Sequence, residues 1–115
     1  MSTYARELDA TELAALLAGT SYPVIAVNNG QSLGLLVVFG NGCTAGAVSL
    51  KSAATKDFAG TWSEQTYADC PASPPGANGE AVTVAVEIVG AFVRPELKTA
   101  LAGGTITKVV IYVGQ

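Results

Sequence analysis

Short segments with a two-residue hydrophobic period, broken by turns rich in glycine and asparagine, constrain the fold of this chain most. The strongest segment covers residues 81–89, which are β-branched at most positions, as strands favour. Residues 28–30 and 40–42 consist of Asn and Gly, which tolerate the positive φ of tight turns. Further strands are expected at residues 22–27, 33–39, 44–51, 61–67 and 105–113. Strands that recur about every 8–12 residues predict an antiparallel β-sandwich, jelly-roll-like in arrangement.

Proline and glycine mark where this pattern stops. Residues 69–79 contain three prolines and two glycines, so we expect an irregular loop there. Residues 91–94 continue the strand pairing after a bend at Gly90, and Pro95 is expected to end that strand. Residues 96–102 are then expected to form one helical turn or a loop.

One helix is expected near the N-terminus. Asp9 and Glu12 have the spacing of a capping box, in which each side chain satisfies a backbone N–H at the start of a helix. Leu8 and Leu13 stand at the two positions of a hydrophobic staple. With Gly19 as the residue after the helix, the sequence predicts a helix over residues 10–18.

The leucines of this helix must pack against something, because a helix this short is not stable alone in water. Leu13, Leu16 and Leu17 share one face at helical spacing. We expect residues 1–20 to form an arm and helix that precede a sandwich domain of residues 21–115. On this interpretation the three leucines are candidate contacts with a partner protein.

The composition favours a protein that packs against neighbours. Charged residues make up 13% of the chain, apolar residues make up 50%, and the net charge is −3. A surface with so few charges suits an assembly, and a monomer with a neutral surface is the alternative. The six basic residues are scattered, so no stripe is expected to bind nucleic acid or an anionic membrane. Apolar runs fall far below the ~18 residues of a membrane span, and the polar N-terminus shows no secretory signal, so synthesis in the cytoplasm is expected.

Little in the sequence points to catalysis. The absence of histidine removes the commonest general base and most zinc sites. The glycines are not followed by the Gly-Lys-Ser/Thr of a phosphate-binding loop. Glu64 and Glu87, on strands expected to be adjacent, are the one carboxylate pair worth testing, and two outward-facing strand residues are the alternative. We therefore expect no enzyme activity, no cofactor and no metal.

Cys43 and Cys70 are candidates for a disulfide. If the strands run up and down in series, both cysteines fall in connections at the same end of the sandwich. A bond would close a loop of about 27 residues and contribute roughly 3.5 kcal/mol in the chain-entropy model. Two unrelated reduced thiols, which are normal in a cytoplasmic protein, are the alternative.

Five aromatic residues are candidates for a sugar-stacking platform. Trp62 stands on a short strand, where a lone tryptophan more commonly fills the interior of a sandwich. An exposed Trp62 beside polar loops would favour sugar binding, and a buried one would favour a structural role. The other four candidates are Tyr4, Tyr22, Tyr67 and Tyr112.

The order of features resembles a family of phage proteins. A glycine-containing strand at residues 33–39 is followed by residues 47–52 (AVSLKS) and by a polar connection into Gly60-Thr-Trp62. Residues 92–95 (FVRP) then lead through Gly103-Gly104 to a terminal strand. This pattern covers about three quarters of the chain and resembles the small jelly-roll virion proteins of tailed bacteriophages, including capsid decoration and head-fibre proteins.

The resemblance implies a non-enzymatic virion structural protein that decorates or stabilises the capsid surface. The implied partners are virion proteins such as the major capsid protein and further copies of the same chain, in a homo-oligomer. The implied location is the virion, with synthesis in the host cytoplasm. A carbohydrate- or receptor-binding β-sandwich module is the alternative.

Overall fold

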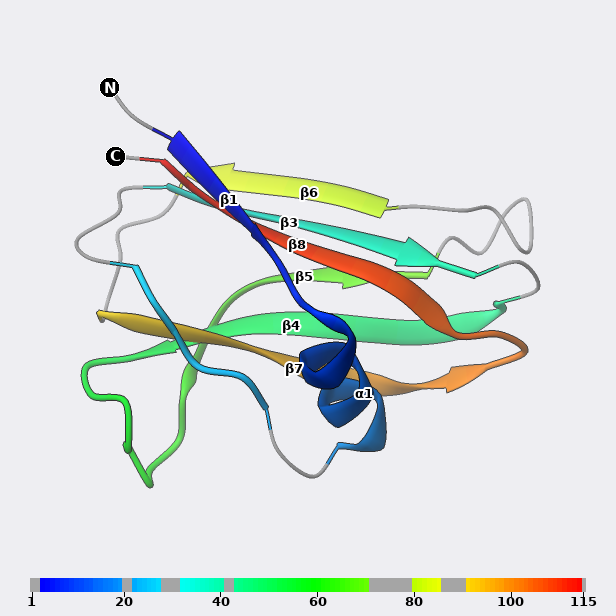
Figure 1. The fold of residues 1–115 in the computed structure, drawn as a ribbon, viewed down its shortest axis with the longest axis horizontal. Helices are drawn as coiled ribbons and strands as arrows, with labels where there is room; N and C mark the ends of the chain where they lie inside the picture. The colour runs from blue at the N-terminus through cyan, green and yellow to red at the C-terminus, as the bar shows by residue number, and fades with distance from the viewer. Residues whose placement is uncertain are drawn as a thin grey trace.

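Two antiparallel β-sheets face each other, and one helix lies at their side (Figure 1). The computed structural model describes residues 3–19, 22–27, 32–40, 43–70, 80–85 and 91–114. Within these ranges the elements are β1 (Thr3–Glu7), α1 (Ala10–Ala18), β2 (Ile25–Ala26), β3 (Ser32–Phe39), β4 (Ala45–Ala53), β5 (Ser63–Asp69), β6 (Glu80–Ala85), β7 (Phe92–Ala102) and β8 (Ile106–Gly114).

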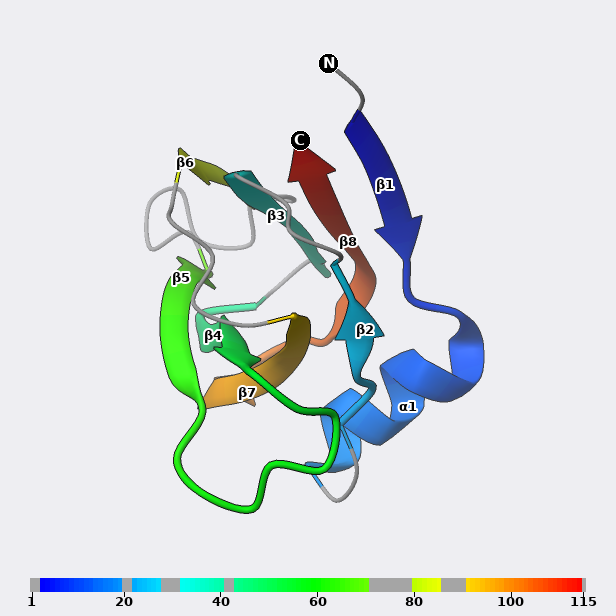
Figure 2. The ribbon, with the colours of Figure 1, turned by 90° about the vertical axis from the view of Figure 1, so that its left-hand side faces the viewer.

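The strand order is that of a jelly roll. One sheet has the order β1-β8-β3-β6 and the other has the order β2-β7-β4-β5. Within each sheet, all of these neighbouring strands pair antiparallel. Successive strands alternate between the sheets except at the β4–β5 hairpin, and Figure 2 shows the two layers nearly end-on. Eight strands in two sheets with these crossings match the double-sheet jelly roll. The predicted fold class is confirmed.

The hydrophobic core lies between the sheets, and the two-residue period of the strands builds it. Inward positions alternate with outward ones because successive side chains of a strand point to opposite faces. Almost fully buried core residues come from β3 (Leu33, Leu35, Val37 and Phe39), β4 (Val48 and Leu50), β7 (Val93) and β8 (Val109, Ile111 and Val113).

The helix forms as its capping residues predict. The backbone N–H of Glu12 donates to Asp9 Oδ1 at 2.8 Å, and the backbone N–H of Asp9 donates to Glu12 Oε1 at 3.0 Å. Gly19 ends the helix in the left-handed conformation, with φ of 70°. The capping box and the helix bounds of 10–18 are confirmed.

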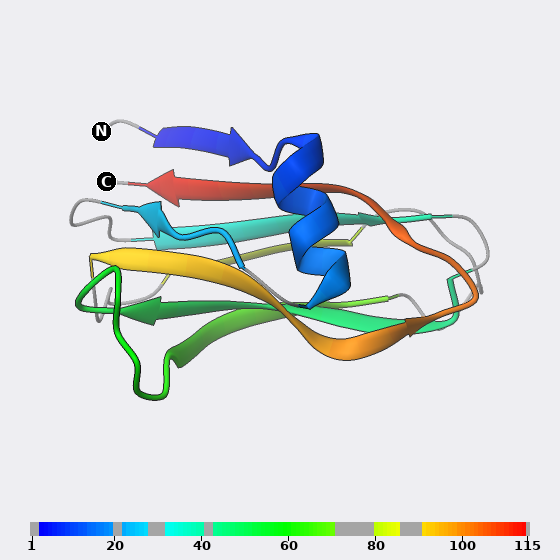
Figure 3. The ribbon, with the colours of Figure 1, turned by 60° about the horizontal axis from the view of Figure 1, so that its bottom comes forward.

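The prediction of an N-terminal arm outside the sandwich is wrong. β1 pairs with β8 along its whole length and is an edge strand of the first sheet, so α1 follows a strand of the sandwich and does not precede the sandwich. α1 contacts β8 of one sheet and β7 of the other (Figure 3). Arg6 of β1 binds Glu12 of α1 at 2.6 Å, which ties the strand to the helix. Residues 3–19 therefore contribute to the sandwich itself.

The leucines of α1 lie against the chain's own core. Leu16 is 0% exposed, so its predicted contact with a partner is wrong. A short helix gains most of its stability by burying its apolar face, and the nearest apolar surface is the core between the sheets. Leu13 and Leu17 are partly buried and pack against this core. For these two residues a partner contact stays a prediction that involves only their exposed parts.

The expectation that Pro95 ends a strand is also wrong. β7 runs through Pro95 to Ala102, so residues 96–102 are strand and neither a helical turn nor a loop. Proline lacks the N–H that a strand donates to its neighbour and is tolerated where one side of the strand has no partner. Pro95 lies in such a place, because β2 pairs with β7 only at Phe92 and Val93.

Several further predictions are refined or lie outside the described residues. β2 covers only Ile25–Ala26 of the strand expected over 22–27. β6 is described over Glu80–Ala85, so the rest of the strand expected over 81–89 is outside. The expected turns at 28–30 and 41–42, the loop at 71–79 and the bend at Gly90 also lie outside the described residues.

Candidate binding surface

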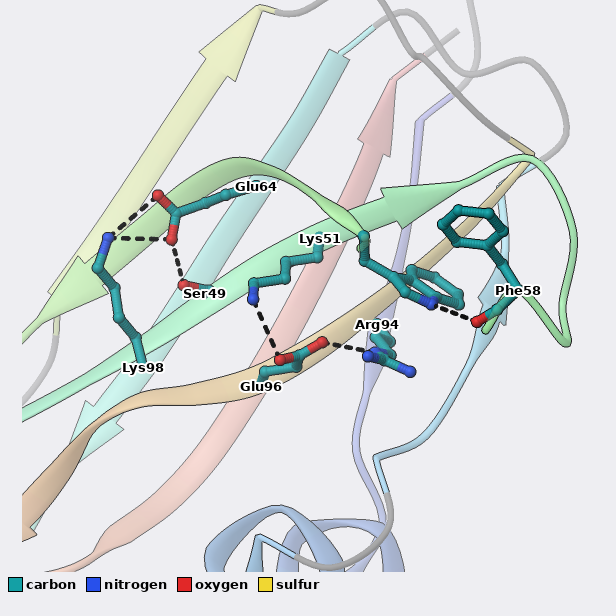
Figure 4. A network of polar contacts seen from close by, with 8 residues as sticks. Ser49, Lys51, Phe58, Glu64, Arg94, Glu96 and Lys98 are labelled. Atoms are coloured by element: carbon teal, nitrogen blue, oxygen red, sulfur yellow. Dashed lines mark hydrogen bonds and ion pairs between the residues drawn. The ribbon is translucent and has the colours of Figure 1, made fainter. Parts of the chain in front are cut away.

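The outer face of the β2-β7-β4-β5 sheet carries a layer of charged side chains. Val48, Leu50 and Val93 face the core, so the residues that alternate with them face outward. The register places Ser49 opposite Glu96, and Lys51 opposite Arg94. We call this outer surface the charged face, and it comprises Ser49, Lys51, Glu64, Tyr67, Arg94, Glu96 and Lys98. Figure 4 shows these residues except Tyr67.

Glu64 is the acceptor at one end of the charged face. The Ser49 hydroxyl donates to Glu64 Oε1, and Lys98 Nζ lies 3.0 Å from both carboxylate oxygens. The ammonium of Lys98 also lies 3.9 Å from the centre of the Tyr67 ring. The hydrogen bond from Ser49, followed by that from Lys98, lowers the pKa of the Glu64 carboxyl below its ordinary value of 4.5. Glu64 is therefore held as a carboxylate at neutral pH.

Glu96 is the acceptor at the other end. Arg94 Nε lies 2.6 Å from Glu96 Oε2, and Lys51 Nζ lies 3.3 Å from Glu96 Oε1. The Arg94 guanidinium lies 4.3 Å from the centre of the Trp62 ring, and Trp62 Nε1 donates to the carbonyl of Phe58 at 3.0 Å. Stacking on an aromatic face is a common arrangement for guanidinium groups. This contact holds Arg94 against the face of the Trp62 ring.

Trp62 is buried, but it does not fill the sandwich interior as expected. The side chain is 4% exposed and is not a member of the core cluster between the sheets. Arg94 and the segment that includes Phe58 cover it on the outside of the sheet. Among the side chains that the structure describes, the exposed aromatics are Phe58, Tyr67 and Tyr112.

The candidates for a sugar platform lie on more than one surface. Tyr67 and Tyr112 lie on the outer faces of different sheets, and Tyr22 packs against the core. The side chain of Tyr4 lies outside the described residues. Tyr22 and Trp62 lie near each other, since the Arg94 guanidinium is 5.9 Å from the centre of the Tyr22 ring and 4.3 Å from that of Trp62. Among the described side chains, no single surface holds all of the candidates.

The outer face of the β1-β8-β3-β6 sheet is very different. The register places Ala5 and Gly34 on either side of Tyr112, and Leu36 beside Val110. Leu36 and Val38 are half-buried, and Tyr112 is 37% exposed. We call Ala5, Gly34, Leu36, Val38, Val110 and Tyr112 the apolar face. Two charges lie beside it: Glu7 is opposite Val110, Lys108 is opposite Val38, and Lys108 Nζ lies 3.7 Å from Glu7 Oε1.

The carboxylate pair proposed from the sequence stays a prediction, because the structure describes only one of its two members. Glu64 is bound by Ser49 and Lys98, and Glu87 lies outside the described residues. An ionised carboxylate that already accepts two donors is a poor general acid.

The two cysteines do lie together. Cys70 Sγ donates to the carbonyl of Cys43 at 3.2 Å, and both side chains are buried thiols. The prediction that they share one end of the sandwich is confirmed. The strand series assumed in making it was wrong, because β3 and β4 belong to different sheets.

The charged face was not predicted from the sequence. The signal was present in the alternation of Arg94, Glu96 and Lys98, which are two residues apart and share one face of a strand. Ending the strand at Pro95 concealed it.

Within the described ranges, no group of three or more His, Cys, Asp or Glu side chains is arranged to hold a metal ion. Among the same residues, no helix has the length and apolar character needed to cross a membrane. Comparisons with protein-family models, with curated proteins and with solved structures found no match to this chain.

Proposed function

We propose that this chain is a non-enzymatic structural protein of a bacteriophage virion that decorates or stabilises the capsid surface as a homo-oligomer. The observation that carries the proposal is the eight-stranded jelly roll, an architecture common among viral capsid domains. The burial of Trp62 also favours a structural role, because a sugar platform needs that ring exposed.

The contrast between the two outer faces supports an orientation for the protein. The charged face satisfies its carboxylates internally and keeps its ammonium groups near water, as a solvent-facing surface does. The apolar face has few charges and small residues at Ala5 and Gly34, which allow another surface to approach closely. We propose that the apolar face lies against the capsid shell and that the charged face points outward.

Two tyrosines of similar exposure give a matched test of this orientation. Tyr112 is 37% exposed on the apolar face, and Tyr67 is 43% exposed on the charged face. Tyr112→Glu and Tyr67→Glu would each be mixed with shells of the major capsid protein encoded by the same genome, and binding would be measured by co-sedimentation. Circular dichroism would first establish that both variants fold.

The proposal requires that the unchanged protein sediments with the shells, that Tyr112→Glu loses binding and that Tyr67→Glu keeps it. Failure of the unchanged protein to bind would overturn the capsid role. Equal binding by both variants would overturn the orientation.

Carbohydrate binding is the second candidate, and the exposure of Tyr67 beside Lys98 and Glu64 favours it. An aromatic ring near charged hydrogen-bonding groups is a usual element of sugar sites. The same two variants test it on a glycan array, where sugar binding predicts loss of signal for Tyr67→Glu and not for Tyr112→Glu. Absence of any signal from the unchanged protein would exclude this candidate for the glycans on the array.

A further inference from the structure

Cys43 and Cys70 lie where the chain passes between the two sheets. Cys43 lies in the connection from β3 of one sheet to β4 of the other, and Cys70 directly follows β5 on the way back to the first sheet. β3 and β5 end, and β4 begins, at the same end of the sandwich, on the right in Figure 1. Cys43 therefore lies just before β4 and Cys70 just after β5, so both are at the open end of the β4–β5 hairpin.

Several contacts fix the two cysteines at this end. The backbone N–H of Cys70 donates to the carbonyl of Gly46 at 2.9 Å, and the Cys70 thiol donates to the carbonyl of Cys43 at 3.2 Å. The Cys43 thiol donates to the carbonyl of Ala45 at 3.3 Å. Gly104, between β7 and β8, packs so closely that a Cβ there would lie 2.8 Å from the Cys43 nitrogen. Cys43, Cys70 and Gly104 thus share one packed site at this end of the sandwich.

We propose that Cys43 and Cys70 form an intramolecular disulfide when the folded protein meets a small disulfide oxidant such as oxidised glutathione. Cys70 reacts first, because it is 8% exposed and Cys43 is 0% exposed. The Cys70 thiolate attacks one sulfur of oxidised glutathione, which breaks the S–S bond of the oxidant, forms a mixed disulfide between Cys70 and glutathione, and releases one glutathione thiolate. The Cys43 thiolate then attacks Cys70 Sγ and releases the second. The protein loses two protons and two electrons, and the oxidant becomes two molecules of reduced glutathione. This inference does not depend on the proposed capsid role.

The bond would convert the β4–β5 hairpin into a closed ring. Closing a ring of about 27 residues restricts the unfolded chain more than the folded one, so the oxidised protein is expected to melt higher by on the order of 10 °C. Burial and the neighbouring Cys43 raise the pKa of the Cys70 thiol to about 11. Oxidation should therefore be slow at neutral pH and should accelerate as the pH approaches that value, because only the thiolate reacts.

The test treats the purified full-length chain with oxidised glutathione and then alkylates it without reduction. Mass spectrometry is expected to show loss of two hydrogen atoms and no alkylation, and a peptide pair that joins Cys43 to Cys70. The melting temperature of this product should exceed that of the same sample after reduction, a comparison that needs no substitution.

Cys43→Ala and Cys70→Ala are matched controls in which the ring cannot close. Each is expected to show no rise in melting temperature on oxidation and to retain one thiol that is alkylated or carries glutathione. Two alkylated thiols in the oxidised full chain, two bound glutathiones, or a disulfide that leaves the melting temperature unchanged would each overturn the proposal.

Discussion

Replacing Leu16 by alanine tests whether α1 belongs to the core of the sandwich. Leu16 is 0% exposed and belongs to the same cluster as the core residues of the strands, so Leu16→Ala leaves a cavity. Alanine is a good helix former, so the substitution costs nothing in helix propensity. The expected loss is about 3–5 kcal/mol of the free energy of unfolding, the range for fully buried leucines.

Such a loss is large for a domain of this size, whose total stability is on the order of 5–15 kcal/mol. Urea denaturation followed by circular dichroism would measure it as a lower midpoint with an unchanged slope. Thr11→Ala on the exposed side of the same helix is the control, and it is expected to change stability by less than about 0.5 kcal/mol. A cost below about 1 kcal/mol for Leu16→Ala would refute the packing of α1 and return the helix to the role of an external arm.

Two further substitutions test the packed end and the charged face. Gly104→Ala places a Cβ against the backbone of Cys43 and should cost about 1–3 kcal/mol of unfolding free energy. Gly60→Ala is the control and should cost little, because its Cβ meets only the exposed ring of Phe58. Equal melting temperatures for the two variants would contradict the packing at Gly104. Glu64→Gln should remove a stabilisation that is full above pH 4.5 and is lost as the pH falls through the lowered pKa of the folded state. The gap in melting temperature between Glu64→Gln and the unchanged protein should therefore narrow in acid, and a gap that stays constant would show that Glu64 does not titrate as the structure indicates.

The sequence correctly predicted those helices and strands that are determined by residues within the element itself. The capping box at Asp9 and Glu12 fixed the start of α1, because both partners of each hydrogen bond lie within one turn. The period-two segments predicted β3, β4 and β8 to within about two residues, since the buried face of each strand is written in its own residues. The fold class followed from their spacing.

The failures concern features that depend on distant residues. β1 has no strong apolar alternation of its own and exists because β8 offers it a paired edge. The strand runs through Pro95 because β2 is only two residues long and leaves that side of β7 without a partner strand at this position. Neither fact can be read from the segment concerned, because each is a property of a neighbour in the sheet.

The charged face shows why a surface is harder to predict than a fold. Its ion pairs join β4, β5 and β7, so they depend on the register of three strands. A shift of one residue in β7 would turn Arg94 and Glu96 toward the core and Val93 toward solvent, so burial of the apolar residues sets the register and the charges follow. The same alternation on the other sheet leaves Leu36, Val110 and Tyr112 on the outer face, with Lys108 of β8 and Glu7 of β1 as the charges beside them. Core packing therefore explains which residues of each strand face outward. It does not explain why the outward residues are charged on one sheet and mostly apolar on the other. A partner bound to the apolar face, as we propose, would account for that difference.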